Sequence, residues 1–276
     1  MAALLALLAA VSFGVSDVAG AVASRRASAL AVSFVLLVAG FPVLAVGLVL
    51  APGEPSVAAI GLGALAGGIG TIGLVLYLRS MAVGPVGVIS PISALVGVAV
   101  PVSWGVAVSG EVLSIVQVVG VLGGILAVVM VAWSPGASLR AYGSAGSLVA
   151  LIAGTLFGLY FVILDATPAG SGLWPLVGAR ASGTLAVAIL LAAIRRPVPP
   201  RSHWPLIVLS GATDASANIL FLLATRSGLL SLASLLSSLY PVVALLLARA
   251  FLQERLTPLQ GAGVVLALCA TTALIV

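Results

Sequence analysis

The sequence predicts an all-α integral membrane protein with ten transmembrane helices in two inverted five-helix repeats. Composition argues against a soluble domain, because 62% of the 276 residues are hydrophobic and only 6% are charged, whereas soluble domains carry about 25% charged residues. Apolar runs of roughly 20 residues, the length that crosses a bilayer core, recur along the chain. A short motif late in the first half also recurs in the second half. These three observations predict the fold class.

Ten continuous apolar segments follow one another along the chain. Arginines, glycines, prolines and other polar residues separate them, and no connection is long enough to form a soluble domain. The segments lack the alternation that a membrane β-strand needs, whereas a helix satisfies its backbone hydrogen bonds within the segment. We therefore expect membrane-spanning helices at 2–21, 29–50, 57–79, 86–107, 113–133, 144–164, 174–194, 204–224, 229–250 and 258–276.

A pattern of an acid, a leucine, a hydroxyl, a glutamine and a glycine occurs twice in the chain. It begins at Glu111 and again, 143 residues later, at Glu254. Upstream, the dipeptide Phe13-Gly14 has a counterpart in Phe157-Gly158 at nearly the same shift. Apolar sequences align easily by chance, but the shared spacing of polar residues indicates an internal repeat.

The repeat places five predicted helices in each half, residues 1–138 and 139–276. Because five is an odd number, the second half enters the membrane from the opposite side. A pseudo-two-fold axis in the membrane plane then relates the halves, an arrangement that is common in secondary transporters with a site near mid-membrane. The repeat therefore predicts alternating access around a central site.

Several short motifs match a known pattern: Ser12–Asp17, Leu223–Arg226, Leu239–Pro241, Glu254–Thr257 and Gln260. Together they resemble the ten-helix EamA-like branch of the drug/metabolite transporter superfamily, over nearly the whole chain. The first half departs from the pattern, because Gly97-Val98 stand where the repeat would place Tyr240-Pro241. The resemblance implies a central cavity and the export or exchange of small metabolites. It leaves the substrate open, since members of the superfamily carry amino acids, nucleotide precursors, choline-like compounds and drugs.

Three ionisable side chains lie inside predicted spans: Asp17, Arg180 and Asp214. An ionisable group at membrane depth is costly unless it faces a cavity or a partner, so all three are candidates for binding a substrate or a proton. Each also has a structural interpretation. Asp17 lies near enough to Arg25 or Arg26 to form an interfacial ion pair, Arg180 is able to extend toward the headgroups, and Asp214 is able to pair with Arg180.

Polar neighbours accompany both acids. Ser210 and Asn218 lie four residues before and after Asp214, on the same helix face, and Ser16 adjoins Asp17. Further hydroxyl and aromatic residues lie in the spans at 86–107 and 229–250, which the family resemblance places at the central site: Ser90, Ser93, Ser238 and Tyr240. Tyr160 is a further candidate because it lies deep in the span at 144–164. Each of these side chains either contacts a substrate or packs between helices, where small hydroxyl residues allow close approach.

Composition also argues against several other functions. The chain has no lysine, and its eleven arginines lie singly or in pairs near span ends rather than on a nucleic-acid-binding face. It has no phosphate-binding loop and no cluster of metal-ligating residues, and it contains one histidine and one cysteine. We therefore expect no enzyme activity, no cofactor, no metal and no nucleic-acid partner.

The arginines predict the orientation of the chain. Nine of the eleven follow odd-numbered predicted spans, which the positive-inside rule places in the cytoplasm, with both termini outside. We expect a multi-pass protein of the inner (plasma) membrane. The nine are Arg25, Arg26, Arg79, Arg140, Arg195, Arg196, Arg201, Arg249 and Arg255.

These features predict a gradient-driven transporter of a small-molecule substrate in a lipid bilayer. Asp214, and with it Asp17, is expected to bind a proton or a cationic group. Two alternatives stay open at this point: a passive facilitator without ion coupling, and a membrane partner subunit that transports nothing. The sequence leaves the coupling ion and the oligomeric state undetermined.

Overall fold

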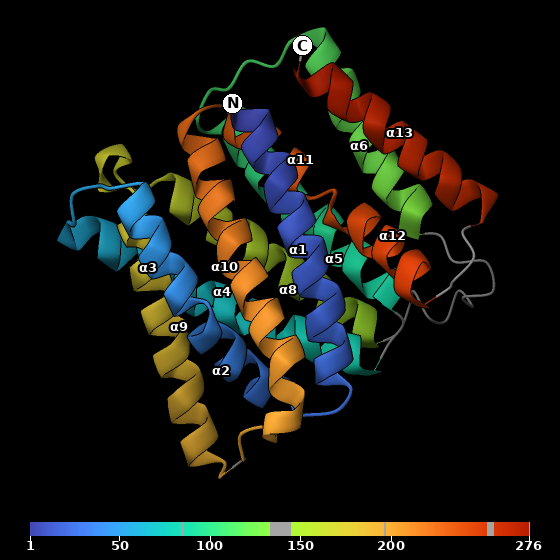
Figure 1. The fold of residues 1–276 in the computed structure, drawn as a ribbon. Helices are drawn as coiled ribbons and strands as arrows, with labels where there is room; N and C mark the ends of the chain where they lie inside the picture. The colour runs from blue at the N-terminus through green and yellow to red at the C-terminus, as the bar shows by residue number, and fades with distance from the viewer. Residues whose placement is uncertain (84–85, 133–144, 196, 253–256, 276) are drawn as a thin grey trace.

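The computed structural model describes residues 1–83, 86–132, 145–195, 197–252 and 257–275, and within these ranges all regular secondary structure is helical (Figure 1). The all-α prediction is confirmed. The helices of the first half are α1 (Ala2–Ser24), α2 (Ala29–Ala39), α3 (Phe41–Leu50), α4 (Val57–Val83), α5 (Val86–Ala107) and α6 (Ile115–Ala132). Those of the second half are α8 (Ala145–Asp165), α9 (Trp174–Ala193), α10 (Trp204–Arg226), α11 (Leu230–Ser237), α12 (Tyr240–Leu252) and α13 (Pro258–Ile275).

Each of the ten predicted spans contains a described helix. Among the described residues, seven helical stretches are long and apolar enough to cross a membrane, and three more apolar helices are shorter: Ile92–Ala107, Ile115–Met130 and Pro258–Ala270. The number of crossings therefore stays a prediction.

The repeated sequence motif forms the same local structure twice. At the start of α6, the Ser114 backbone N–H donates to Gln117 Oε1 (3.0 Å) and the Gln117 N–H donates to Ser114 Oγ (3.2 Å). Thr257 and Gln260 make the same two bonds, at 3.0 and 3.2 Å, at the start of α13. Each pair is a capping box, which satisfies backbone donors that a helix start leaves free. The hydroxyl and the glutamine of the repeated motif therefore recur because each pair caps the start of a helix.

Two predicted spans are interrupted rather than continuous. The span expected at 29–50 divides into α2 and α3 at Gly40, and the span expected at 229–250 divides into α11 and α12 at Ser238 and Leu239. At the first interruption, the Leu37 carbonyl accepts a hydrogen bond from Arg180 of α9 (3.1 Å). An interrupted helix can offer backbone groups to other parts of the protein, and it is tolerated at membrane depth only inside the protein or along a cavity.

The helices of the two halves interleave in reciprocal pairs. Helix α1 packs against α10 and α4 packs against α8; α4 also packs against α9, while α10 packs against α2 and α3. Likewise α5 packs against α8, while α1 packs against α11 and α12. Helices α6 and α13 pack against each other at one edge of the bundle (Figure 1). Each contact recurs between the helices that hold the same places in the other half of the chain. The contact of α1 with α10, for example, corresponds to that of α8 with α4.

Glycines allow α4 and α9 to approach closely. A Cβ atom added at Gly63 would meet the Pro175 backbone, and one added at Gly67 would meet the Ala179 backbone. This is the close helix contact that small residues four apart predict. It brings one helix from each half together beside the cavity described next.

Candidate functional site

The helices enclose a cavity of about 140 Å³. Its lining comes from both halves of the chain, namely α1, α4 and α5 with the ends of α2 and α3 from the first half, and α8 to α12 from the second. Most of the lining is apolar, and the ionisable side chains other than tyrosines that the structure places on it are Asp17, Arg180 and Asp214. The three intramembrane charges predicted from the sequence thus lie around one space.

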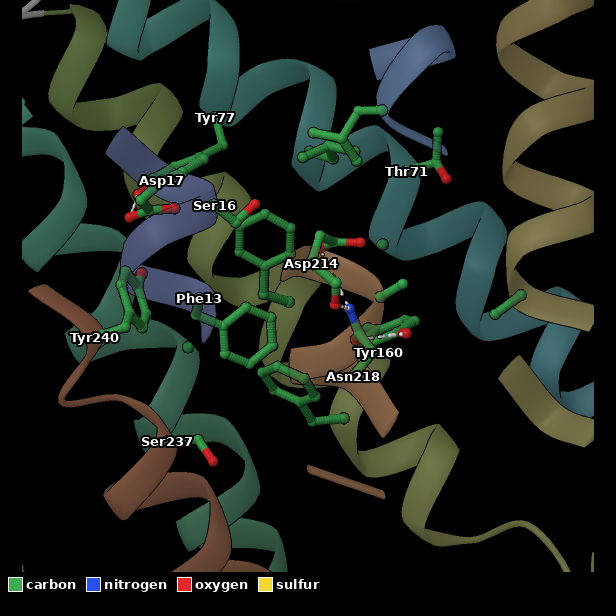
Figure 2. A pocket seen from close by; sticks show the side chains of 18 of the residues that line it. Phe13, Ser16, Asp17, Thr71, Tyr77, Tyr160, Asp214, Asn218, Ser237 and Tyr240 are labelled. Carbon is green, nitrogen blue, oxygen red and sulfur yellow. Dashed lines mark hydrogen bonds between the residues drawn. The ribbon is translucent and has the colours of Figure 1, made fainter. Parts of the chain in front are cut away.

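A first polar group of the cavity is built around Asp214 (Figure 2). Arg180 Nη2 donates to Asp214 Oδ2 at 2.7 Å, and the two side chains are 7% and 19% exposed. Asn218, one turn further along α10, donates to Asp214 Oδ1 (3.2 Å) and accepts a hydrogen bond from the Tyr160 hydroxyl (2.8 Å). Asp214 is therefore paired with Arg180, as its structural interpretation expected. It also lines the cavity, as its interpretation as a binding residue expected.

Arg180 does not extend toward the headgroups. Its side chain is buried, with one nitrogen on Asp214 and another on the Leu37 carbonyl at the interruption between α2 and α3. Gly40 leaves room for it, since a Cβ atom there would meet the guanidinium. The ion pair therefore ties α9 and α10 to the interrupted helix.

Asp17 forms a second polar group with different partners. The Tyr77 hydroxyl (2.5 Å) and the Ser90 hydroxyl (3.0 Å) both donate to Asp17 Oδ2. The interfacial ion pair with Arg25 or Arg26 is absent, because within the described ranges the one salt bridge is that of Arg180 with Asp214. Asp17 is thus held by hydroxyls and has no cationic partner there.

The remaining predicted residues divide between lining and packing. Ser16 and Ser210 each donate to the other's carbonyl at 2.9 Å, which joins α1 to α10 in the cavity wall. Ser238 donates to the Leu235 carbonyl of its own turn, so this hydroxyl stabilises the end of α11. Ser90, Ser93, Tyr160 and Tyr240 are also buried or half-buried, and of these Ser93, Tyr160 and Tyr240 line the cavity.

Aromatic side chains that the sequence analysis did not select complete the wall. Phe13 packs against Phe161 and Tyr240, with ring centroids 6.1 Å apart in both pairs. Tyr77 was not selected either, although a tyrosine inside an apolar span is a useful signal because its buried hydroxyl needs a partner. Trp104, another deep aromatic residue of the predicted spans, is 42% exposed and does not line this cavity.

The cavity lining has features that suit the binding of a small molecule. In the described part of the chain, no three His, Cys, Asp or Glu side chains gather closely enough to hold a metal ion. The lining offers one balanced ion pair and one acid held only by hydroxyl groups. Several aromatic rings stand beside them, including Phe13, Tyr77 and Tyr240 (Figure 2). A small molecule with both apolar and polar parts matches this combination.

Comparison with solved structures supports the fold. A protein known from its crystal structure shares 19% sequence identity with this chain, with a TM-score of 0.73 over 100% of this chain and 98% of the other. At this level of identity, the likeness concerns the fold alone. A search of curated proteins finds no match.

Comparison with protein families identifies the chain more closely. The profile of the EamA-like transporter family matches it twice, at residues 1–133 and 144–276, so that nearly the whole chain is covered by two copies. The two matches follow the two sets of helices that interleave around the cavity. This multi-pass, α-helical chain therefore belongs to the EamA-like transporter family, whose members are membrane transporters of small molecules.

Proposed function

We propose that this protein is a gradient-driven exporter or exchanger of small metabolites or drugs, which works by alternating access through the cavity. The observation that carries the proposal is that helices from both halves line one polar-containing cavity inside an otherwise apolar bundle. Polar and ionisable groups at membrane depth are expensive and typically mark a substrate or ion pathway.

Alternating access requires two halves that exchange roles, and the packing supports this. The reciprocal pairs, such as α1 with α10 and α4 with α8, are the contacts expected when a two-fold axis relates two intertwined repeats. We propose on this basis that residues 1–138 and 139–276 are inverted five-helix repeats, each crossing the membrane five times.

The orientation proposed from the arginines also agrees with the arrangement of the helices. The α1–α2 and α9–α10 connections, which carry Arg25, Arg26, Arg195 and Arg201, lie at the end of the bundle opposite both termini (Figure 1). The positive-inside rule assigns that end to the cytoplasm and the termini to the outside of an inner (plasma) membrane.

Transport is tested with purified protein reconstituted in liposomes. Labelled amino acids, nucleosides, quaternary amines and cationic drugs are screened for uptake in exchange for unlabelled compound of the same class. We expect one class to exchange faster than in protein-free liposomes. No exchange for any class, with correctly folded and inserted protein, would favour a partner subunit that transports nothing.

Coupling to protons is tested with an imposed proton gradient. We propose that Asp214 and Asp17 carry the coupled proton or a cationic group of the substrate. Asp214→Asn and Asp17→Asn are then expected to abolish the gradient dependence, while Glu54→Gln, the same change at an exposed connection, preserves it. If the rate of exchange by the wild-type protein does not depend on the proton gradient, the protein is a passive facilitator instead.

A further inference from the structure

The charge of the cavity lining is not balanced. Arg180 and Asp214 neutralise each other at 2.7 Å, which leaves Asp17 as the lining carboxylate without a cation in the described part of the chain. Burying an unpaired carboxylate is costly, and binding of a cation or a proton relieves that cost. One positive charge bound in the cavity would therefore balance the charge of its lining.

The hydrogen bonds of Asp17 leave one of its oxygens available. Tyr77 and Ser90 both donate to Oδ2, and no described donor reaches Oδ1. Because an ionised carboxylate accepts hydrogen bonds at both oxygens, Oδ1 offers a ligand a strong acceptor. The carboxylate is half-buried and lines the cavity, so a ligand there can reach it.

Aromatic rings stand next to this carboxylate (Figure 2). The Tyr240 hydroxyl donates to the carbonyl of Ser90 at 3.4 Å, while the hydroxyl of the same serine donates to Asp17. The Tyr240 ring in turn packs against Phe13. Ring faces attract cations, and they also cover the apolar body of a ligand.

Unpaired hydroxyl groups of described residues also line the cavity. The Ser234 side chain, from α11, is 4% exposed, lines the cavity and has no hydrogen-bond partner within the described ranges. A buried hydroxyl without a partner costs about 1–3 kcal/mol, so a water molecule or a polar ligand atom at this point would stabilise the protein. The hydroxyl of Ser93, from α5, is likewise buried in the lining without a described partner, so two hydroxyls and Asp17 Oδ1 are available to a ligand.

These features together distinguish between possible cations. A metal ion prefers several oxygen ligands around it, but among the described residues no three His, Cys, Asp or Glu side chains gather to hold one, and much of the surrounding wall is aromatic and aliphatic. The cavity, about 140 Å³, is close in size to a cavity of roughly 150 Å³ that holds benzene in an engineered protein. The geometry favours a small organic molecule.

We propose that the cavity binds a small organic monocation, an amine or quaternary ammonium, with its charged nitrogen at Asp17 Oδ1 and its apolar body against Phe13 and Tyr240. The inference rests on the proposed transport function for its biological meaning but concerns binding alone. It assigns recognition of the cationic ligand to Asp17, while Asp214 remains ion-paired with Arg180.

The test is equilibrium binding to the purified full chain, with benzylamine and its neutral analogue benzyl alcohol, and with tetramethylammonium as a permanent cation. We expect both cations to bind and benzyl alcohol to bind at least about thirty-fold more weakly, the cost of leaving a buried charge unpaired. Asp17→Asn is expected to remove this preference, and Glu54→Gln to retain it. Equal affinity of the wild type for benzylamine and benzyl alcohol would overturn the proposal and indicate that Asp17 holds a proton.

Tyr240→Leu is a second variant that keeps the carboxylate, in case Asp17→Asn does not fold. We expect it to weaken tetramethylammonium binding about two- to thirty-fold, the range of a cation–π contact, with a smaller change for benzyl alcohol. Unchanged tetramethylammonium affinity in a folded Tyr240→Leu protein would contradict the aromatic part of the site. Because the measurement is binding, cation binding without transport would overturn only the proposed function, and transport of neutral compounds alone would overturn only this inference.

Discussion

The guanidinium of Arg180 is buried and has two described partners, the carboxylate of Asp214 and the carbonyl of Leu37. Removal of one partner from a buried ion pair leaves the other charge uncompensated, whereas removal of both leaves no charge to solvate. Arg180→Leu alone is therefore expected to lower the free energy of unfolding by about 3–5 kcal/mol. Arg180→Leu combined with Asp214→Leu is expected to cost less than the single change. Denaturant unfolding in detergent micelles measures both, and a double variant less stable than the single one would contradict the argument.

The ionisable residues of the site could be predicted from the sequence, and the pairing of Asp214 with Arg180 was one of the interpretations that it offered, but their other partners were not predicted. Asp17, Arg180 and Asp214 were identified because any charge inside an apolar span must face a partner or a cavity. That Arg180 also reaches the Leu37 carbonyl depends on how α9 turns toward α2, and no spacing along the chain records that. The same holds for Tyr77, which reaches Asp17 from a helix 60 residues away in the chain.

Two neighbouring glycines of α4, Gly67 and Gly68, allow the close contact between α4 and α9 to be tested. A Cβ atom at Gly67 would meet the backbone of Ala179, whereas one at Gly68 would meet nothing within 4 Å. Gly67→Ala is expected to destabilise the protein by about 1–3 kcal/mol, because α4 and α9 must separate. Gly68→Ala, with the same gain in helix propensity, is expected to be neutral or slightly stabilising. Thermal unfolding of the two purified variants gives the comparison, and equal effects would contradict the close contact.

The helix starts of α6 and α13 give a second prediction at this scale. Ser114→Ala and Thr257→Ala each remove a side-chain acceptor from a capping box, and each is expected to cost about 1 kcal/mol. Amide hydrogen exchange should accelerate in the first turn of the affected helix alone. Exchange that stays unchanged at Gln117 in Ser114→Ala would show that the cap does not hold this turn.

Helix positions followed from apolar length and punctuation, and the described helices begin and end close to the predicted ranges. The interruptions at Gly40 and at Ser238 were not predicted. A single glycine or a pair of polar residues in an apolar run is compatible with a continuous helix. Between α2 and α3, the hydrogen bond that Arg180 donates to Leu37 comes from a distant helix. The local sign is a proline just after each interruption, Pro42 and Pro241, which lacks the N–H that a continuous helix would use.

The orientation of the whole molecule is tested by thiol labelling. After Cys269→Ala removes the native thiol, Glu54→Cys and Arg201→Cys place single cysteines in exposed connections. We expect a membrane-impermeant reagent to label the cysteine at position 54 in intact cells and the one at position 201 only after permeabilisation, because the arginine-bearing end faces the cytoplasm. The reverse pattern would show that the chain is inserted the other way round.

The hydrogen bond from Arg180 to Leu37 joins two positions that are 143 residues apart, the same interval that separates the two copies of the repeated motif. The same interval relates Asp214 to Thr71, another residue of the cavity wall. If the halves are the repeats proposed above, a dimer of two identical halves would carry the same side chain at both positions of each pair, so that an arginine or an aspartate there would occur twice around the cavity. The two halves of this chain instead carry different side chains at these positions, so the cavity is asymmetric in charge although its helices pair reciprocally.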